Sequence, residues 1–150
     1  MKVTIQQETG CENEVIIRYD KLTPEVDRII QYVQSGKPRI VGKIDDRTVM
    51  LDIAKILYIE TVDDKTFAYT TSEVVRLEAS LTRLIEDLND IRFFRCSKSM
   101  IININKVASL KSLSSNRIDA TMKNGEHIII SRTYATEFRK ILKGGGANEE

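Results

Sequence analysis

Hydrophobic residues recur with the spacing of one helical face in three segments of the chain. The first segment begins after Thr23, a residue type that caps helices, and Pro24, which fits a first helical turn. The second begins after Ser80, and the third leads towards three consecutive glycines near the C-terminus. The apolar positions are Val26, Ile29, Ile30 and Val33; Leu81, Leu84, Ile85 and Leu88; and Tyr134, Phe138, Ile141 and Leu142. Their spacing of three and four residues predicts three helices.

Short runs rich in β-branched and aromatic residues fill most of the remaining chain, with turn residues between them. Two runs, Val3–Ile5 and Val15–Tyr19, precede the first predicted helix. After Pro38 the runs cover residues 39–44, 48–52, 56–60, 65–71, 74–78, 92–96, 101–104, 107–113, 117–122 and 127–131. Asn124-Gly125, between the last two runs, is typical of a hairpin turn because both residue types accept positive φ. The pattern predicts a mainly β fold with two or three helices, an α+β chain.

Residues 36–38 are the best candidate for a domain boundary, because Gly36 can end the first helix and Pro38 opposes its continuation. We predict a strand-strand-helix extension over residues 1–37 and a main domain over residues 38–143. Gly144 begins a glycine-rich segment, which predicts a flexible tail over residues 144–150.

The charge of the chain is balanced overall but unevenly distributed. The 23 basic and 22 acidic side chains give a net charge of +1, yet residues 89–143 hold 11 basic and 4 acidic side chains, a net charge of +7. A concentrated positive field attracts polyanions such as nucleic acids, whatever the overall charge. A chance cluster of charges on a solvated face is the alternative, and charge alone does not separate the two interpretations.

Composition and hydropathy limit the cellular setting. The two cysteines, Cys11 and Cys96, have no metal-ligand spacing and form no dense disulfide framework, so a reducing compartment is the simple interpretation. The longest apolar runs are too short to cross a bilayer, and the N-terminus lacks the apolar segment of a signal peptide. We therefore predict a cytoplasmic protein.

Catalytic chemistry has little support in the sequence. His127 is the only histidine and lies in an alternating strand pattern, which favours a surface position. Cys96 alternates with Phe94 and is predicted to pack inward as a small hydrophobic residue. The acidic pairs Asp45-Asp46 and Asp63-Asp64 lack further ligands at calcium-loop spacing, and the chain has no glycine-rich phosphate loop. We predict that the protein is not an enzyme and binds no metal or cofactor.

Three short polar segments carry hydroxyl and cationic donors between apolar runs. They are Asp64-Lys65-Thr66, Ser97-Lys98-Ser99 and Ser131-Arg132-Thr133. Such donors suit contacts with phosphates and base edges, and loops on a β scaffold could present them on one surface. Each segment taken alone is equally compatible with an ordinary polar turn.

Several segments between residues 39 and 143 follow one another in a characteristic order. They are Leu57-Tyr58-Ile59-Glu60, Leu81–Leu88, Phe94-Arg95-Cys96-Ser97-Lys98-Ser99 followed by Ile101-Ile102-Asn103, Asn124-Gly125-Glu126, and Ile130-Ser131-Arg132 with Tyr134. In this order they resemble the LytTR DNA-binding domain family, which includes the output domains of LytR/AlgR-type bacterial response regulators. The resemblance implies a mostly β fold of several small sheets. It also implies sequence-specific binding of duplex DNA by loops that enter successive major grooves.

The resemblance also implies which residues contact DNA. The contact in the first loop falls on Lys65 or Thr66, the second on Lys98 with Ser97 beside it, and the third on Arg132. The full predicted set is Lys65, Thr66, Ser97, Lys98, Ser99, Arg132, Tyr134, Arg139 and Lys140, of which Arg139 and Lys140 are expected to position the duplex. Well-known relatives have asparagine where this chain has Lys98, and lysine favours guanine or phosphate over adenine.

We therefore predict a cytoplasmic bacterial transcription regulator whose partner is double-stranded DNA. The extension over residues 1–37 is too short for a receiver domain, which predicts a stand-alone regulator. The resemblance further implies a homodimer on repeated half-sites and a membrane-bound regulatory partner protein. The alternative is a protein-interaction or ligand-sensing module whose cationic end binds an acidic partner.

Overall fold

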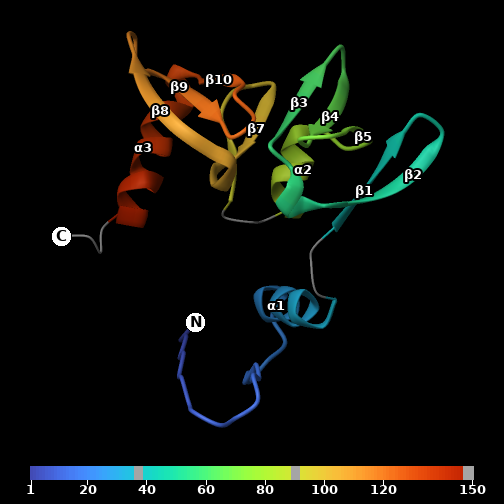
Figure 1. Ribbon diagram of the computed structural model, residues 1–150, viewed down its shortest axis with the longest axis vertical. Helices are drawn as coiled ribbons and strands as arrows, with labels where there is room; N and C mark the ends of the chain where they lie inside the picture. Colours follow the sequence, from blue (N-terminus) through green and yellow to red (C-terminus); the bar gives the residue numbers. More distant parts are fainter. Residues whose placement is uncertain (36–38, 89–91, 147–150) are drawn as a thin grey trace. The chain divides into compact units, whose positions relative to one another are not determined.

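The computed structural model describes residues 1–35, 39–88 and 92–146. The chain separates into two compact units, Met1–Pro38 and Arg39–Glu150, and each is described by itself (Figure 1). The predicted boundary at residues 36–38 and the end of the predicted tail, residues 147–150, lie outside the described residues.

In the first unit, the described residues 1–35 contain one helix, α1 (Pro24–Ser35). The predicted cap is confirmed, because Thr23 Oγ1 accepts a hydrogen bond of 3.3 Å from the backbone N–H of Val26. The strands predicted at Val3–Ile5 and Val15–Tyr19 are wrong, since neither segment is in a strand. A local preference for extended backbone makes a strand only where a partner strand and a buried face exist, and these side chains have neither.

The second unit contains two antiparallel sheets and two helices. The large sheet has the strand order β2-β1-β5-β4-β3-β7-β6, and the small sheet has the order β10-β9-β8. The elements are β1 (Arg39–Ile44), β2 (Arg47–Asp52), β3 (Tyr58–Val62), β4 (Lys65–Tyr69), β5 (Val74–Leu77), α2 (Leu81–Leu88), β6 (Phe93–Arg95), β7 (Met100–Asn103), β8 (Val107–Leu113), β9 (Arg117–Met122), β10 (His127–Ile130) and α3 (Arg132–Gly146). The predicted fold class, mainly β with two or three helices, is confirmed, and the described residues contain three α-helices.

Two short 3-10 helices, η1 (Ile53–Lys55) and η2 (Ile104–Lys106), interrupt the strands. Asp52 Oδ1 accepts a hydrogen bond of 2.9 Å from Ala54 N and thereby caps η1. Asn103 does the same for η2 through Asn105 N, at 3.0 Å. The third strand was predicted to begin at residue 56. It begins at Tyr58, after the 3-10 helix that Asp52 caps.

The large sheet separates two hydrophobic cores. On one face, α2 contributes Leu81 and Leu84 to a core with Ile59 and Ile101 of the central strands. On the other face, the small sheet and α3 cover the end of the sheet near β3 and β7; Figure 1 shows α3 in red beside β8, β9 and β10. The second core contains Leu57, Tyr58, Phe94, Cys96, Ile102, Ile118, Ala120, Met122, Ile128, Ile130, Ala135 and Phe138. The alternation of strand side chains between two faces assigns each residue to one core.

The ends of α2 and α3 test two further sequence predictions. Ser80 caps α2 as predicted, since its hydroxyl accepts a 3.2 Å hydrogen bond from Arg83 N. The prediction that the last helix ends before Gly144 is wrong, because α3 continues to Gly146. Glycine costs only about 1 kcal/mol relative to alanine inside a helix, so it disfavours a last turn without forbidding it.

Candidate nucleic-acid interface

Backbone hydrogen bonds bring the three polar segments predicted from the sequence together. The N–H of Thr61, in β3, donates to the carbonyl of Ser99 at 2.8 Å, which ties the β3–β4 hairpin to the β6–β7 loop. The N–H of Ser131 donates to the carbonyl of Cys96 at 2.9 Å, which ties the start of α3 to the same loop. The β6–β7 loop is therefore bonded to the β3–β4 hairpin on one side and to the start of α3 on the other.

The β3–β4 hairpin presents Lys65 and encloses Thr66. Its turn residues have positive φ, 50° at Asp63 and 62° at Asp64, a conformation that aspartate tolerates because its short side chain can bond locally. Lys65 is exposed, and no described residue forms a hydrogen bond or ion pair with its ammonium group.

Thr66 lies inside β4, within the strand predicted over residues 65–71. Its side chain is only 5% exposed, and its hydroxyl lies 3.2 Å from that of Thr61 in a hydrogen bond. Successive strand residues point to opposite faces, so a one-residue choice between Lys65 and Thr66 decides which side chain faces solvent. Lys65 is the residue of this pair that an incoming partner can reach.

The β6–β7 loop is a tight turn held by its own backbone. The N–H groups of Cys96 and Ser97 both point to the carbonyl of Met100, at 3.1 and 3.4 Å. Ser97 Oγ accepts a 3.3 Å hydrogen bond from Ser99 N and lies 3.5 Å from Ser99 Oγ. Lys98, at the tip, is exposed, and among the described residues nothing bonds to its ammonium group. The loop therefore leaves one cation free to meet a partner.

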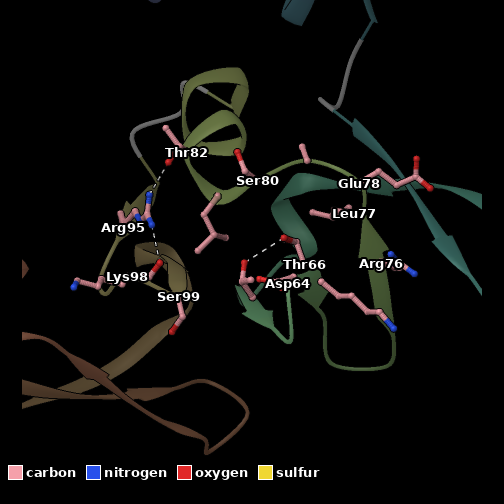
Figure 2. Close-up of a pocket in the computed structure, with 14 residues that line it drawn as sticks. Asp64, Thr66, Arg76, Leu77, Glu78, Ser80, Thr82, Arg95, Lys98 and Ser99 are labelled. Carbon is pink, nitrogen blue, oxygen red and sulfur yellow. Dashed lines mark hydrogen bonds between the residues drawn. The ribbon is translucent and has the colours of Figure 1, made fainter.

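Arg95 closes the same loop from the side of α2. Its Nε donates to the carbonyl of Ser97 at 3.2 Å, its Nη2 to the carbonyl of Lys98 at 2.7 Å, and its Nη1 to Thr82 Oγ1 at 3.1 Å. Figure 2 shows Arg95 between Thr82 above it and Lys98 below it. No sequence pattern indicated this role, because Arg95 is simply a charged residue between two apolar ones along the chain.

The third segment forms the first turn of α3. The carbonyl of Ser131 accepts hydrogen bonds from Tyr134 N at 3.0 Å and from Ala135 N at 2.9 Å. Arg132, the first residue of the helix, is exposed. Tyr134 is half-buried and packs against the core that contains Phe138, so its ring supports the helix start. The positive end of the α3 dipole adds to the field of Arg132.

Asn116, in the turn between β8 and β9, connects two of the predicted cationic residues. Its amide nitrogen donates to the carbonyl of Arg132 at 3.4 Å and to Thr136 Oγ1 at 3.1 Å, and its amide oxygen accepts from Nη1 of Arg139. Arg139 is therefore half-buried and held by a neighbour, whereas Lys140 is exposed. In the sequence, only the place of Asn116 between two predicted strands could have indicated a turn. The structure confirms the turn, with a φ of 56° at Asn116.

An open groove of about 630 Å³ runs beside these loops, between the β3–β4–β5 strands and the start of α2 (Figure 2). Five hydroxyl side chains line it: Thr61, Thr66, Ser80, Thr82 and Ser99. Lys65, Arg76, Arg95 and Lys98 line it as well, together with Asp64 and Glu78. Glu78 also pairs with Lys43 at 3.2 Å, so the positive charge of the groove is only partly balanced.

The side chains with catalytic potential in the second unit include Cys96 and His127. Burial raises the pKa of the Cys96 thiol to about 12, and the thiol donates a weak 3.6 Å hydrogen bond to the carbonyl of Met100. Cys96 is buried and His127 is exposed, as predicted. His127 Nδ1 lies 3.0 Å from Asp119 Oδ1.

Among the described residues, no three His, Cys, Asp or Glu side chains are grouped to hold a metal ion. No helix in the described ranges is long and apolar enough to cross a membrane.

Comparison with known proteins identifies similar sequences and a similar structure. Residues 46–143 match the family model described as the LytTr DNA-binding domain. The chain is 31% identical over 100 residues to the sensory transduction protein LytT of Bacillus cereus, an alignment that covers 67% of this chain and 41% of that protein. It is 28% identical over 99 residues to the transcriptional regulatory protein YpdB of Escherichia coli K12, covering 65% and 41%.

A solved structure shares the fold. It is the LytTr DNA-binding domain of a putative methyl-accepting/DNA response regulator from Bacillus cereus, with a TM-score of 0.67 and 29% sequence identity. The match covers 71% of this chain and 98% of that one. The chain spans about two fifths of the length of the curated relatives it matches.

Proposed function

This chain belongs to the LytTR family of DNA-binding domains, and we propose that it is a transcription regulator that reads duplex DNA through its loops. The observation that carries the proposal is the convergence of three loops, each with an exposed cation whose side chain no described residue binds. Lys65, Lys98 and Arg132 come from the β3–β4 hairpin, the β6–β7 loop and the start of α3. A rigid β scaffold that presents such donors suits contacts with base edges in a groove.

The three cations have different recognition chemistry. The guanidinium of Arg132 can donate two parallel hydrogen bonds to O6 and N7 of guanine. Lys98 can donate to the same atoms or to phosphate, with less geometric demand. Ser97 and Ser99 flank Lys98 with hydroxyl groups, and we propose that they assist phosphate contacts.

Residues of α3 are proposed to hold the duplex rather than to read it. Lys140 is exposed, and the guanidinium of Arg139 donates to the side chain of Asn116. Both lie in the segment with net charge +7, which favours the phosphate backbone whatever the base sequence. Tyr134 is proposed to support the first turn of α3 while its edge faces the duplex.

Selection of bound sequences from a random duplex pool tests the proposal directly. We expect one enriched sequence motif with two repeated half-sites. Titration of that duplex at several salt concentrations should give a log–log slope of roughly −4 to −5 per bound chain, which corresponds to about five neutralised phosphates. A pool without enrichment and a flat salt dependence would overturn the proposal and favour the acidic-partner alternative.

The proposal extends to the assembly and setting of the protein. We propose that two copies occupy the repeated half-sites, that the protein works in the cytoplasm without catalytic activity or a cofactor, and that a membrane-bound protein regulates it. Binding by the 150-residue chain itself would mean that DNA recognition needs no receiver domain. Sedimentation with one-site and two-site duplexes measures the stoichiometry, and a single bound copy on the two-site duplex would contradict the dimer. Recovery of the chain only in soluble fractions of its host would contradict the membrane partner.

A further inference from the structure

The side chain of Arg95 donates three hydrogen bonds, two to backbone carbonyls of the β6–β7 loop and one to a side chain of α2. Two acceptors are the successive carbonyls of Ser97 and Lys98, at 3.2 and 2.7 Å, and the third is Thr82 Oγ1 at 3.1 Å. Arg95 pairs with Ile101 across β6 and β7, and Ile101 belongs to the core beneath α2. Its side chain therefore starts on the α2 face of the sheet and reaches the loop from the side of α2 (Figure 2).

The direction of Lys98 depends on its backbone, because no described residue holds its side chain. The carbonyl of Lys98 itself is fixed by the shortest of the three Arg95 contacts. A guanidinium is planar and can hold two acceptors in a fixed relative position, which an ammonium group cannot do. The two carbonyl contacts thus orient the peptide planes on both sides of the Lys98 Cα.

We propose that Arg95 is a positioning residue for Lys98, which fixes the β6–β7 loop against α2 and thereby sets the base preference of the loop. This inference rests on the proposed function. Three of the five N–H donors of Arg95 are used within the protein, which holds its side chain against the backbone of the loop. Thr82 is the anchor that ties this loop to the helix.

The competing role for Arg95 is a direct contact with a DNA phosphate from the groove. The two roles differ in their salt dependence. Loss of a phosphate contact weakens all duplexes alike and reduces the salt slope by about one. Loss of a positioning contact lowers the preference for the selected duplex over a scrambled one and leaves the salt slope unchanged.

The Arg95→Lys variant separates the roles, because lysine keeps the charge but cannot hold both carbonyls. We expect about tenfold weaker binding of the selected duplex, little change on the scrambled duplex, and an unchanged salt slope. Thr82→Val should cause a smaller loss of the same kind. Arg76→Lys is the matched control, since Arg76 lines the same groove and no described residue bonds to its guanidinium.

A double-mutant cycle tests whether Arg95 acts through Lys98. In the Lys98→Ala background, Arg95→Lys should have no further effect on the preference between the two duplexes. An equal loss in both backgrounds, a reduced salt slope, or wild-type preference in Arg95→Lys would each overturn the positioning role.

A measurement on the free protein keeps this inference separate from the proposed function. Arg95→Lys should increase amide hydrogen exchange in residues 96–99 while the melting temperature stays close to that of Arg76→Lys. Unchanged exchange would overturn the positioning role even if DNA binding is confirmed. A wild-type chain without any duplex preference would instead overturn the proposed function, whatever the exchange result.

Discussion

The phenolic hydroxyl of Tyr58 donates a 2.6 Å hydrogen bond to Oε2 of Glu126 and thereby joins the two sheets of the second unit. Tyr58 lies in β3 of the large sheet, and Glu126 lies in the turn between β9 and β10 of the small sheet. The ring of Tyr69 stacks on Tyr58 with a centroid distance of 4.6 Å. Lys98 is attached to the large sheet and Arg132 follows the small one, so this bond contributes to the spacing of the two cations.

Tyr58→Phe should lower the free energy of unfolding by about 1–3 kcal/mol, because it removes a short hydrogen bond to a charged carboxylate. Urea unfolding measures the loss. Tyr134→Phe is the matched control, since no described residue bonds to the Tyr134 hydroxyl, and it should change the free energy by less than about 0.5 kcal/mol. Equal effects of the two substitutions would show that the Tyr58–Glu126 hydrogen bond does not contribute to the free energy of unfolding.

The stability of the folded chain should fall in alkaline solution. Burial and the neighbouring carboxylate of Glu126 raise the pKa of Tyr58 well above its ordinary value of 10.0, and burial likewise raises the pKa of Tyr69. Above about pH 10 the unfolded chain loses these protons while the folded chain keeps them, so rising pH favours unfolding. Urea unfolding between about pH 8 and pH 11 should show this decline in the wild type and a shallower one in Tyr58→Phe. Parallel declines in the two proteins would contradict the assignment to Tyr58.

Arg132→Ala should cost about 1–3 kcal/mol on the selected duplex and much less on a scrambled one, because only the selected duplex offers the guanine edge. Lys98→Ala should show the same difference more weakly. Substitution of both Arg139 and Lys140 by alanine should instead weaken binding to all duplexes alike. Titrations at matched salt concentration distinguish the cases, and equal losses on both duplexes for Arg132→Ala would reduce it to a phosphate contact.

Lys65 and Thr66 should respond differently to substitution, because they point to opposite faces of β4. Lys65→Ala should weaken binding of the selected duplex and leave unfolding within about 0.5 kcal/mol of the wild type. Thr66→Val removes a buried hydroxyl from its partner Thr61 and should destabilise the chain by about 1 kcal/mol with little effect on duplex preference. A reversed result would place the base contact at Thr66.

Gly42 allows close approach of β1 and β5. A Cβ atom at this position would lie 2.3 Å from Val75 Cγ1 and 2.9 Å from the carbonyl of Arg76. Gly42→Ala should therefore lower the free energy of unfolding by about 1–3 kcal/mol, as overpacked sites do. Gly144→Ala is the control, because nothing lies within 4 Å of a Cβ there, and it should be neutral or stabilising. Thermal unfolding of both variants checks the contrast.

Local patterns predicted the elements whose determinants are local. The helix over Leu81–Leu88 and its cap at Ser80 depend on neighbouring residues, and both are confirmed. The hairpin at Asn124-Gly125 is confirmed as well, with a φ of 89° at Gly125. The strands predicted before α1 failed because their formation depends on distant partners, which a propensity does not report.

In the candidate site, too, the features that depend on contacts between distant residues could not be predicted from the sequence. The three polar segments could be identified singly, but their convergence depends on the strand order β3-β7-β6 and on hydrogen bonds such as Ser131 to Cys96, 35 positions away. Arg139 is linked to Asn116 across 23 positions, and no periodicity signals such a contact. The choice between Lys65 and Thr66 required the exact register, because a shift of one residue exchanges the faces of a strand.

The bonds that join the three loops to one another run between main-chain atoms, from Thr61 N to the Ser99 carbonyl and from Ser131 N to the Cys96 carbonyl. Every residue except proline supplies these donor and acceptor groups. The side chains at positions 98 and 132 can therefore change during evolution without disturbing the bonds that hold the loops in place. Gene duplicates could diverge to new target sequences by one or two exposed substitutions, and a library randomised at these two positions should yield many folded proteins with altered preferences.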